Sequence, residues 1–333
     1  MGRASRSWVM SMQSKILEIL KNSDSHISGQ EISEKLGVSR QALLKDINTL
    51  KEKGYEISSD KKKGYKLLSL PAYLNEDAVK ATVNTKIIGR NITVLDTVNS
   101  TNDYLKQLGN DGCENGTVVV ARQQTKGKGR LGRQWLSAKD NSVMFSFLLR
   151  PEIAPNEVSA ITPLAGLAIC KAIRKFTKLD CMIKWPNDII VGRKKLVGIL
   201  CEMSAEFDRI EYIITGVGIN VDQTIFPEEI DYKATSILLE TGRHINKNEL
   251  LACVLEFLED EFIKNDLKLT ASALDEYSEM CATIGKSVTF TRGTRKVSGT
   301  AIGLDSNGEL KIMLSDGTVC KVNSGEVTVQ GIY

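Results

Sequence analysis

The chain has 333 residues, which is more than one compact domain usually holds, so we expect two or three domains. Hydrophobic residues make up 42% of the sequence and charged residues 26%, and no apolar run reaches the roughly 18 residues that a membrane span needs. The formal net charge is +3, but residues 1–70 hold 13 Lys and Arg against 8 Asp and Glu, so a basic front precedes a near-neutral body. This asymmetry indicates a separate nucleic-acid-binding module at the front.

The cysteines and histidines exclude several kinds of site. Seven cysteines are scattered along the chain, odd in number and never in a Cys-x-x-Cys pair. This pattern is typical of reduced thiols in a cytoplasmic protein, and not of a disulfide framework or a zinc site. The two histidines, His26 and His244, lie in no motif. We therefore predict no metal-ligating residues and no catalysis through a histidine base.

The front of the chain has the pattern of a helix-turn-helix. Residues 1–13 lack the apolar core of a signal peptide and are predicted to be a loose leader. Amphipathic spacing then predicts three helices, over 14–21, 29–36 and 40–53. Gly37 can take the left-handed conformation that ends the second helix, and Ser39 is a good N-cap for the third. Two helices joined by a glycine-containing turn form the helix-turn-helix motif.

Two short strands are predicted next, at 55–58 and 64–67, around a turn of consecutive lysines. A basic hairpin that follows a recognition helix is the wing of a winged helix, where it contacts DNA phosphates. We therefore predict a winged helix-turn-helix DNA-binding domain over 14–70; a small helical protein-binding module with a solvated lysine turn is the alternative. The predicted DNA-binding residues are Ser39, Arg40, Gln41, Lys45, Asn48, Lys61, Lys62 and Lys63.

After a linker over 71–82, strands and helices alternate, and we predict a mixed α/β domain over 83–282. Ser100, Thr101 and Asn102 stand between a strand and a helix that begins at 103. Their hydroxyl and amide groups lie near a helix start, where backbone donors are also free to bind a ligand. Helix capping is the alternative role for these three residues.

The segment 123–135 alternates glycines with cations. Glycines let the backbone approach a ligand closely, and fixed positive charge around them suits a carboxylate or a phosphate. No Gly-Lys-Ser/Thr closes the segment, so it is not a Walker loop. Taken alone, the segment is more typical of a solvated, flexible basic loop, and the other motifs of the chain are needed to favour a ligand site.

A rare pentapeptide, Lys184-Trp185-Pro186-Asn187-Asp188, lies between apolar strands. It places a cation, an amide and a carboxylate at one sheet edge, which is more than a structural turn requires. Apolar segments with glycine gaps follow over 194–202 and 213–221.

Taken in order, these motifs give the chain a resemblance to the bifunctional biotin protein ligase and biotin-operon repressor family over essentially its whole length. The matching segments are 127–133, 184–188, 195–200 and 216–220. The family's loop commonly contains Gly-Arg-Gly-Arg, so Lys128 is a departure that keeps the charge but loses the planar fork of arginine.

The resemblance implies a two-step reaction with ATP and Mg²⁺. The carboxylate of biotin attacks the α-phosphate of ATP to give biotinyl-5′-adenylate and pyrophosphate, and a lysine of a biotin carboxyl carrier protein then attacks the adenylate. It also implies biotin-responsive repression at operator DNA by a homodimer that forms when the adenylate is bound. No membrane partner is expected.

The resemblance also assigns residues to these steps. The expected catalytic residues are Lys195, Arg130, Lys184 and Asp188. The expected biotin-binding residues are Ser100, Thr101, Asn102, Gln124, Lys128, Gly129, Arg130, Lys195, Gly198, Ile199, Gly216 and Gly218. The expected residues for ATP or the adenylate are Lys128, Arg130, Arg133, Lys195, Asn187, Asn220, Ala234, Thr235 and Ser236.

The last part of the chain shows an amphipathic helix over 248–265 and then short alternating strands separated by glycine-containing turns. The strands are predicted at 287–290, 296–302, 310–314 and 318–322. We therefore expect a small SH3-like β-barrel over 283–333. The whole chain is predicted to be an α/β multidomain protein, with a winged helix-turn-helix in front and a mixed α/β ligase domain at the centre.

Two other functions stay open on the residues alone. A non-catalytic repressor could use the same pocket only to sense biotin, but sensing a neutral ring does not require the charge of Arg130, Lys184 and Lys195. A ligase for a related cofactor acid such as lipoate could use the same fold, but the polar set that includes Gln124 suits a ureido ring better than a dithiolane.

Overall fold

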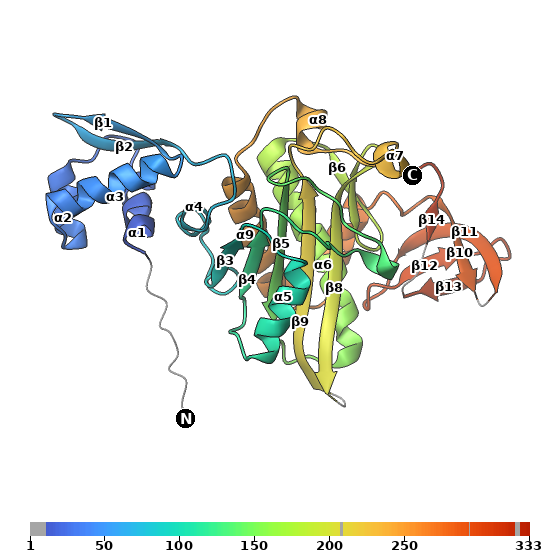
Figure 1. Ribbon diagram of the computed structural model, residues 1–333. Helices are drawn as coiled ribbons and strands as arrows, with labels where there is room; N and C mark the ends of the chain where they lie inside the picture. Colours follow the sequence, from blue (N-terminus) through green and yellow to red (C-terminus); the bar gives the residue numbers. More distant parts are fainter. Residues whose placement is uncertain (1–10, 207–208, 293, 324–326) are drawn as a thin grey trace.

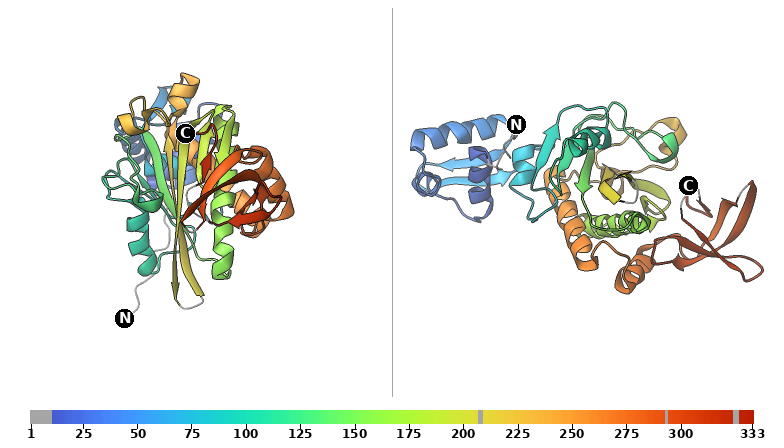
Figure 2. Two further views of the ribbon diagram at one scale, coloured as in Figure 1. Left: turned by 90° about the vertical axis from the view of Figure 1, so that its right-hand side faces the viewer. Right: turned by 90° about the horizontal axis from the view of Figure 1, so that it is seen from below.

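The computed structural model describes residues 11–206, 209–292, 294–323 and 327–333. Three parts follow one another along the molecule: a small helical domain with a hairpin, a central sheet covered by helices, and a second small sheet (Figures 1 and 2). Residues 1–10 of the predicted leader lie outside the described residues. The first helix already begins at Met12, because Ser11 caps it by accepting a hydrogen bond from the Ser14 amide.

The N-terminal domain is a winged helix-turn-helix, as predicted. Its elements are α1 (Met12–Lys21), α2 (Gly29–Leu36), α3 (Arg40–Glu52), β1 (Glu56–Asp60) and β2 (Gly64–Ser69). Gly37 ends α2 with a φ of 66°, and Ser39 accepts from the Ala42 amide at the start of α3. Leu43 and Ile47 bury one face of α3 in a core of its own, which leaves the other face of that helix exposed.

The linker over 71–82 is fixed to the central domain. It contains α4 (Glu76–Lys80) and packs on α9 (Lys247–Asn265). The buried Asn248 side chain of α9 accepts from the Asn75 amide at 2.8 Å. It donates to the carbonyl oxygens of Pro71 and Tyr73 at 2.9 and 3.0 Å. Five polar groups are thereby satisfied in one place, so the DNA-binding domain is held at a defined position.

The central domain is built on a seven-stranded mixed sheet in the order β3-β4-β5-β9-β8-β7-β6. Its strands are β3 (Ile92–Leu95), β4 (Val118–Ala121), β5 (Ser142–Leu149), β6 (Cys181–Lys184), β7 (Asp188–Val191), β8 (Lys194–Glu206) and β9 (Arg209–Asn220). Only the β3–β4 pair is parallel among these described strands.

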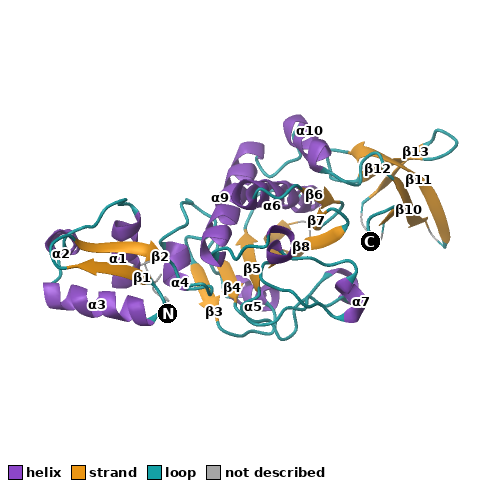
Figure 3. Ribbon diagram, turned by 90° about the horizontal axis from the view of Figure 1, so that it is seen from above, coloured by secondary structure: helices purple, strands orange, loops and turns teal. Residues whose placement is uncertain are grey.

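Helices cover both faces of this sheet. The long α6 (Ile161–Thr177) and α9 lie on one face and α5 (Thr101–Asn110) on the other (Figure 3). Val118 and Val120 pack into the large core on the α6 side, whereas Val119 between them packs into the smaller core under α5. Short helical segments complete the domain: η1 (Arg130–Gly132), η2 (Pro155–Ala160), α7 (Glu228–Asp231), α8 (Ile237–Thr241) and α10 (Ala271–Met280).

The C-terminal domain is an antiparallel sheet in the order β13-β12-β11-β10-β14. Its strands are β10 (Ser287–Arg292), β11 (Arg295–Leu304), β12 (Leu310–Met313), β13 (Val319–Val322) and β14 (Thr328–Val329). The predicted small β-domain is thus confirmed, but its described strands form an open sheet and not a closed barrel, and β14 is an additional strand. The indole of Trp185 donates to the Gly308 carbonyl at 3.0 Å, which fastens this sheet to the central domain.

No helix within the described ranges is both long and apolar enough to span a membrane.

Candidate functional site

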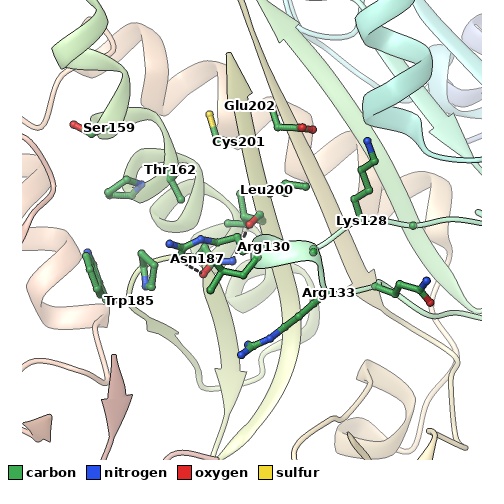
Figure 4. Close-up of a pocket in the computed structure, with 18 of the residues that line it drawn as sticks. Lys128, Arg130, Arg133, Ser159, Thr162, Trp185, Asn187, Leu200, Cys201 and Glu202 are labelled. Atoms are coloured by element: carbon green, nitrogen blue, oxygen red, sulfur yellow. Dashed lines mark hydrogen bonds between the residues drawn. The ribbon is translucent and has the colours of Figure 1, made fainter. Parts of the chain in front are cut away.

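Two adjoining cavities lie above the central sheet and share the loop 126–134. The larger has a volume of about 780 Å³ and lies between this loop, the 185–187 turn and the C-terminal domain (Figure 4). The smaller, of about 50 Å³, lies deeper, between the loop, the start of α5 and the middle of β8 and β9. The sequence motifs therefore meet at one place.

Polar groups at the start of α5 line the smaller cavity. Ser100 accepts a hydrogen bond from the Asp103 amide, so the capping role holds for this residue. Thr101 donates its amide to the Gln124 side chain at 2.7 Å, and Asn102 accepts from the Ser146 hydroxyl at 2.6 Å. Thr101 and Asn102 are 3% and 4% exposed, so their side chains face the sheet and not solvent. These two residues do more than cap a helix.

Bare backbone forms the floor of this cavity. Gly198 pairs with Gly218, and Leu200 pairs with Gly216, across β8 and β9. A Cβ on Gly216 would lie 2.2 Å from Oδ1 of Asn102, and one on Gly218 would lie 2.4 Å from the indole of Trp135. Glycine is required at both positions because the space above them is already filled by side chains.

The glycine-rich loop folds back over the sheet. Its first part follows the segment before α5, since the Thr125 amide donates to the Val98 carbonyl at 2.9 Å. The Gly129 amide donates to the Arg133 carbonyl at 2.8 Å, which closes a tight turn. Lys128 forms an ion pair with Asp103 of α5. The lysine that departs from the family pattern thus has a partner that fixes the loop to the helix.

A group of cations surrounds the turn between β6 and β7. Arg130 donates to the Asn187 side chain at 3.0 Å, and Figure 4 shows the two facing each other. Lys195 pairs with Asp188 at 2.6 Å. Burial lowers the pKa of the Arg130 guanidinium, and it lowers the pKa of the Lys184 ammonium to about 8. These cations are partly desolvated, so each would interact strongly with an anion.

Four residues predicted to bind ATP lie beside Lys195 but do not line either cavity: Asn220, Ala234, Thr235 and Ser236. Thr235 donates its amide to the Lys195 carbonyl at 2.9 Å, and Asn220 donates to the Thr235 carbonyl at 3.0 Å. Ser236 caps α8. All four are buried; Ala234 and Thr235 contact the backbone of Lys195, Asn220 supports Thr235, and Ser236 supports α8. Their contact with the adenine stays a prediction.

The predicted DNA-binding residues lie together on the N-terminal domain. Ser39 begins α3, and Arg40, Gln41, Lys45 and Asn48 are all on the exposed face of that helix. In the wing, Asp60 accepts from the amides of Lys62 and Lys63 at 2.8 Å, and with Lys61 these lysines extend into solvent. The arrangement suits a helix in a groove with a basic hairpin beside it.

The comparisons with known proteins agree with this arrangement. Residues 12–66 match the model of the HTH domain, residues 94–220 that of the biotin/lipoate A/B protein ligase family, and residues 283–329 that of the biotin protein ligase C terminal domain. Two relatives are the bifunctional ligase/repressor BirA of Bacillus spizizenii and that of Bacillus subtilis. The first is 33% identical over 95% of this chain and 98% of its own length, and the second 35% over 90% and 93%.

The chain belongs to the bifunctional biotin ligase/repressor family. The solved structure of biotin protein ligase from Aquifex aeolicus in complex with biotin and ATP is also similar, with a TM-score of 0.61. It is 31% identical, and the match covers 72% of this chain and 98% of that one. The winged helix-turn-helix thus extends a ligase fold that other proteins have without it.

Three features of this family member's site were missing from the sequence prediction. Glu202 accepts from the Asn102 side chain at 2.6 Å, and Asp103 holds Lys128. Glu202 is the last residue of the predicted segment 194–202, and Asp103 directly follows the predicted site residue Asn102, so an alternating strand pattern and a helix-start position could have indicated them. Tyr333 donates to Asp188 at 2.5 Å from the far end of the sequence, and no local signal points to it.

Proposed function

We propose that this protein activates biotin with ATP and transfers it to a lysine of a biotin carboxyl carrier protein in the cytoplasm, and that its N-terminal domain represses biotin genes by binding operator DNA. The observation that carries the proposal is the joined pair of cavities. One end offers neutral hydrogen-bonding groups above bare backbone, and the other end offers partly buried cations. A ligand with a neutral polar ring and a carboxylate tail fits this change from a neutral to a positively charged lining.

The neutral end suits the ureido ring of biotin. Thr101, Asn102 and Gln124 carry both donors and acceptors there, and Gly216 and Gly218 let the side chains of Asn102 and Trp135 pack directly against the strands beside the cavity. Ser100, Gly198 and Ile199 complete this wall of the cavity. The lining supports biotin over lipoate, because a ureido ring can exchange hydrogen bonds with these side chains and a dithiolane cannot donate any.

The cationic end suits the first chemical step. A carboxylate oxygen of biotin attacks the α-phosphorus of ATP, the bond to the bridging oxygen breaks, and pyrophosphate leaves. Two anions must approach each other, so the positive charges of Lys195 and Arg130 in the cavity walls lower the barrier as charge builds up on the phosphoryl oxygens. Lys184 lines neither cavity and would add its charge from the β6–β7 hairpin. Lys128, Gly129 and Arg133 would close over the adenylate from the loop side, and Asn187 would hold Arg130 in place.

In the second step the neutral amine of the acceptor lysine attacks the carbonyl carbon of the mixed anhydride. The bond from that carbon to the phosphate oxygen breaks, AMP leaves, and the amine gives up a proton. The larger cavity provides the approach, because it adjoins the cations at the reacting end of the smaller one. No histidine is needed for either step.

The residues present also fit Mg²⁺ that is brought in by ATP. This ion is usually held by one or two carboxylates together with substrate phosphates. Asp188 provides one carboxylate beside the cations, and no cluster of three or more His, Cys, Asp or Glu that could hold a metal occurs among the described residues. Bound there, the ion would neutralise charge on the phosphates.

The DNA-binding half is proposed to act as a homodimer whose assembly depends on the adenylate. Two copies of α3 bind a palindromic operator more tightly than one because the second contact becomes intramolecular. An adenylate that orders the loop 126–133 would favour the dimer, and transfer to the acceptor would remove it.

The proposal is tested by measuring pyrophosphate release from ATP with biotin or lipoate, with and without acceptor protein. We expect release with biotin, and continued turnover only when the acceptor is present. Release with lipoate alone would support a ligase for the other acid. Tight biotin binding without any release would indicate a sensor that does not catalyse the reaction.

A further inference from the structure

Tyr333 contacts the turn between β6 and β7 from a position 145 residues further along the sequence. Its hydroxyl donates to Oδ2 of Asp188 at 2.5 Å, and the Nζ of Lys184 lies 3.7 Å from the centre of its ring. Lys184 and Asp188 face each other across the β6–β7 hairpin. Tyr333 therefore contacts both residues that flank the turn containing Asn187.

The position of Tyr333 is fixed by the C-terminal sheet. Val329 of β14 pairs with Val288 of β10 and bridges to Ile332, and the Gln330 amide donates to the Ser287 carbonyl at 2.9 Å. Ile332 is 7% exposed and belongs to the large core. The residue that precedes Tyr333 is thus anchored, so its ring is held against the turn by the fold.

The hydroxyl of Tyr333 decides how Asp188 is oriented. Oδ2 of Asp188 accepts from Tyr333, and Oδ1 pairs with Lys195 at 2.6 Å. Oδ2 is held by a hydrogen bond, whereas Oδ1 is held by the ion pair alone and accepts no hydrogen bond, so the Tyr333 hydroxyl is the hydrogen-bond donor that orients the carboxylate toward Lys195. Burial, and then the charge of Asp188, raise the pKa of Tyr333 above its ordinary value, so the hydroxyl keeps its proton and remains a donor.

We propose that Tyr333 is a positioning residue for adenylate formation, which acts through Asp188 to hold Lys195 and through its ring to hold Lys184. The inference rests on the proposed function, because these two lysines matter there for the attack on ATP. It gives the C-terminal domain, which already lines the larger cavity, a direct contact with the charged residues of the β6–β7 hairpin. Tyr333 does not line the smaller cavity, so it should affect the rate of the chemical step and not the binding of the biotin ring.

The variant Tyr333→Phe tests this role because it keeps the ring over Lys184 and removes only the hydroxyl. We expect the rate constant for adenylate formation to fall about tenfold, the effect of one lost hydrogen bond to a charged group, with the KM for biotin unchanged. The matched control is Tyr212→Phe. Tyr212 also donates a 2.5 Å hydrogen bond, to Asn110, and also lies near a cation, Arg150, but outside both cavities.

A double-mutant cycle shows whether Tyr333 acts through Asp188. If it does, Tyr333→Phe should slow adenylate formation no further once Asp188→Asn is present. The inference is overturned by an unchanged rate in Tyr333→Phe, by a change confined to the KM for biotin, or by effects that simply add. An unmodified chain that releases no pyrophosphate with biotin would overturn the proposed function itself, and with it this inference.

Discussion

The guanidinium of Arg122 lies over the ring of Tyr73, 4.6 Å from its centre. Tyr73 belongs to the linker, and its hydroxyl donates at 2.9 Å to the carbonyl of Lys53, where α3 ends. Arg122 follows β4, donates twice to Asp140 at 2.7 Å and pairs with Asp96 at 3.0 Å. Asp96 precedes the segment 97–102 and Arg122 precedes the segment 123–135, and both segments contribute residues to the lining of the smaller cavity. The contact therefore joins the end of the recognition helix to the ligand site.

Removing the Tyr73 ring should weaken the coupling between ligand and operator. In Tyr73→Ala we expect the gain in operator affinity from biotin plus ATP to shrink severalfold, within the 1–3 kcal/mol typical of such coupling, while pyrophosphate release continues. The measurement is operator affinity with and without biotin and ATP. Tyr73→Phe keeps the ring and loses only the bond to Lys53, so it separates the two contacts. An unchanged gain in Tyr73→Ala would mean that the stacked pair only packs the linker.

Lys195 should contribute mainly to the transition state of adenylate formation. Its ammonium is paired with Asp188 and lies 5.8 Å from the ring centre of Trp135, so it is held at the wall of the site before substrates bind. We expect Lys195→Ala to reduce the rate by two or more orders of magnitude, on the order of 3 kcal/mol for one lost electrostatic contact. Pyrophosphate release by the purified variant at the normal rate would contradict the assigned role.

Arg130 should retain the adenylate after it has formed. Arg130 borders both cavities and donates to Asn187, so it bridges the loop and the turn above the reacting groups. We expect Arg130→Gly to activate biotin but to release the adenylate into solution, where it acylates lysines of bystander proteins. Mass spectrometry of an added inert protein detects this labelling. A variant that neither labels the bystander nor loses affinity would show that the loop does not act as a lid.

Gly216 should tolerate no side chain, because the Asn102 side chain of the smaller cavity packs directly on its backbone. A Cβ there would lie 2.2 Å from Oδ1 of Asn102, which is already bonded to Ser146. We expect Gly216→Ala to weaken biotin binding by tenfold or more, because overpacking typically costs 1–3 kcal/mol. Gly166→Ala in α6 is the control, since its Cβ would meet nothing closer than 3.8 Å. Calorimetric titration with biotin distinguishes the two, and equal affinities would contradict the proposed floor.

The parts of the fold that follow from local sequence were predicted well. The helix-turn-helix was recognisable because Gly37 and Ser39 mark helix ends and because apolar spacing alone sets the buried face of α3. The cavity motifs were recognisable because each is a contiguous segment. The open C-terminal sheet was not predicted, since strand number does not determine whether edge strands meet, and the two-residue β14 has too little pattern to detect.

Contacts between distant segments could not be predicted. Tyr333 and Asp188 are 145 residues apart, and a lone tyrosine carries no motif. The structure buries Asn220 and Ser236 away from both cavities, and such burial depends on how a loop packs on the sheet edge; their expected contact with the adenine stays a prediction. Family resemblance transfers roles to residues in motifs, whereas the residues that orient them are found only in three dimensions.

Lys184 should set the alkaline limit of adenylate formation. Burial, opposed by Asp188 and assisted by Lys195, Arg133 and Lys233, lowers its pKa from 10.5 to about 8, so its charge is lost as the pH rises through about 8. Between these two values the unfolded chain binds more protons at this lysine, so its contribution to stability rises with pH. The rate of pyrophosphate release should therefore fall as the pH rises through about 8, although loss of the Lys184 charge does not destabilise the fold there.

Pyrophosphate release and thermal melting, measured together from about pH 6 to about pH 10, separate the effect on activity from the effect on stability. We expect Lys184→Met to release pyrophosphate more slowly and to show no fall in rate near pH 8. Lys286→Met, at an exposed position, should retain that fall. If the rate of pyrophosphate release in Lys184→Met still falls near pH 8, the group that titrates there is not Lys184.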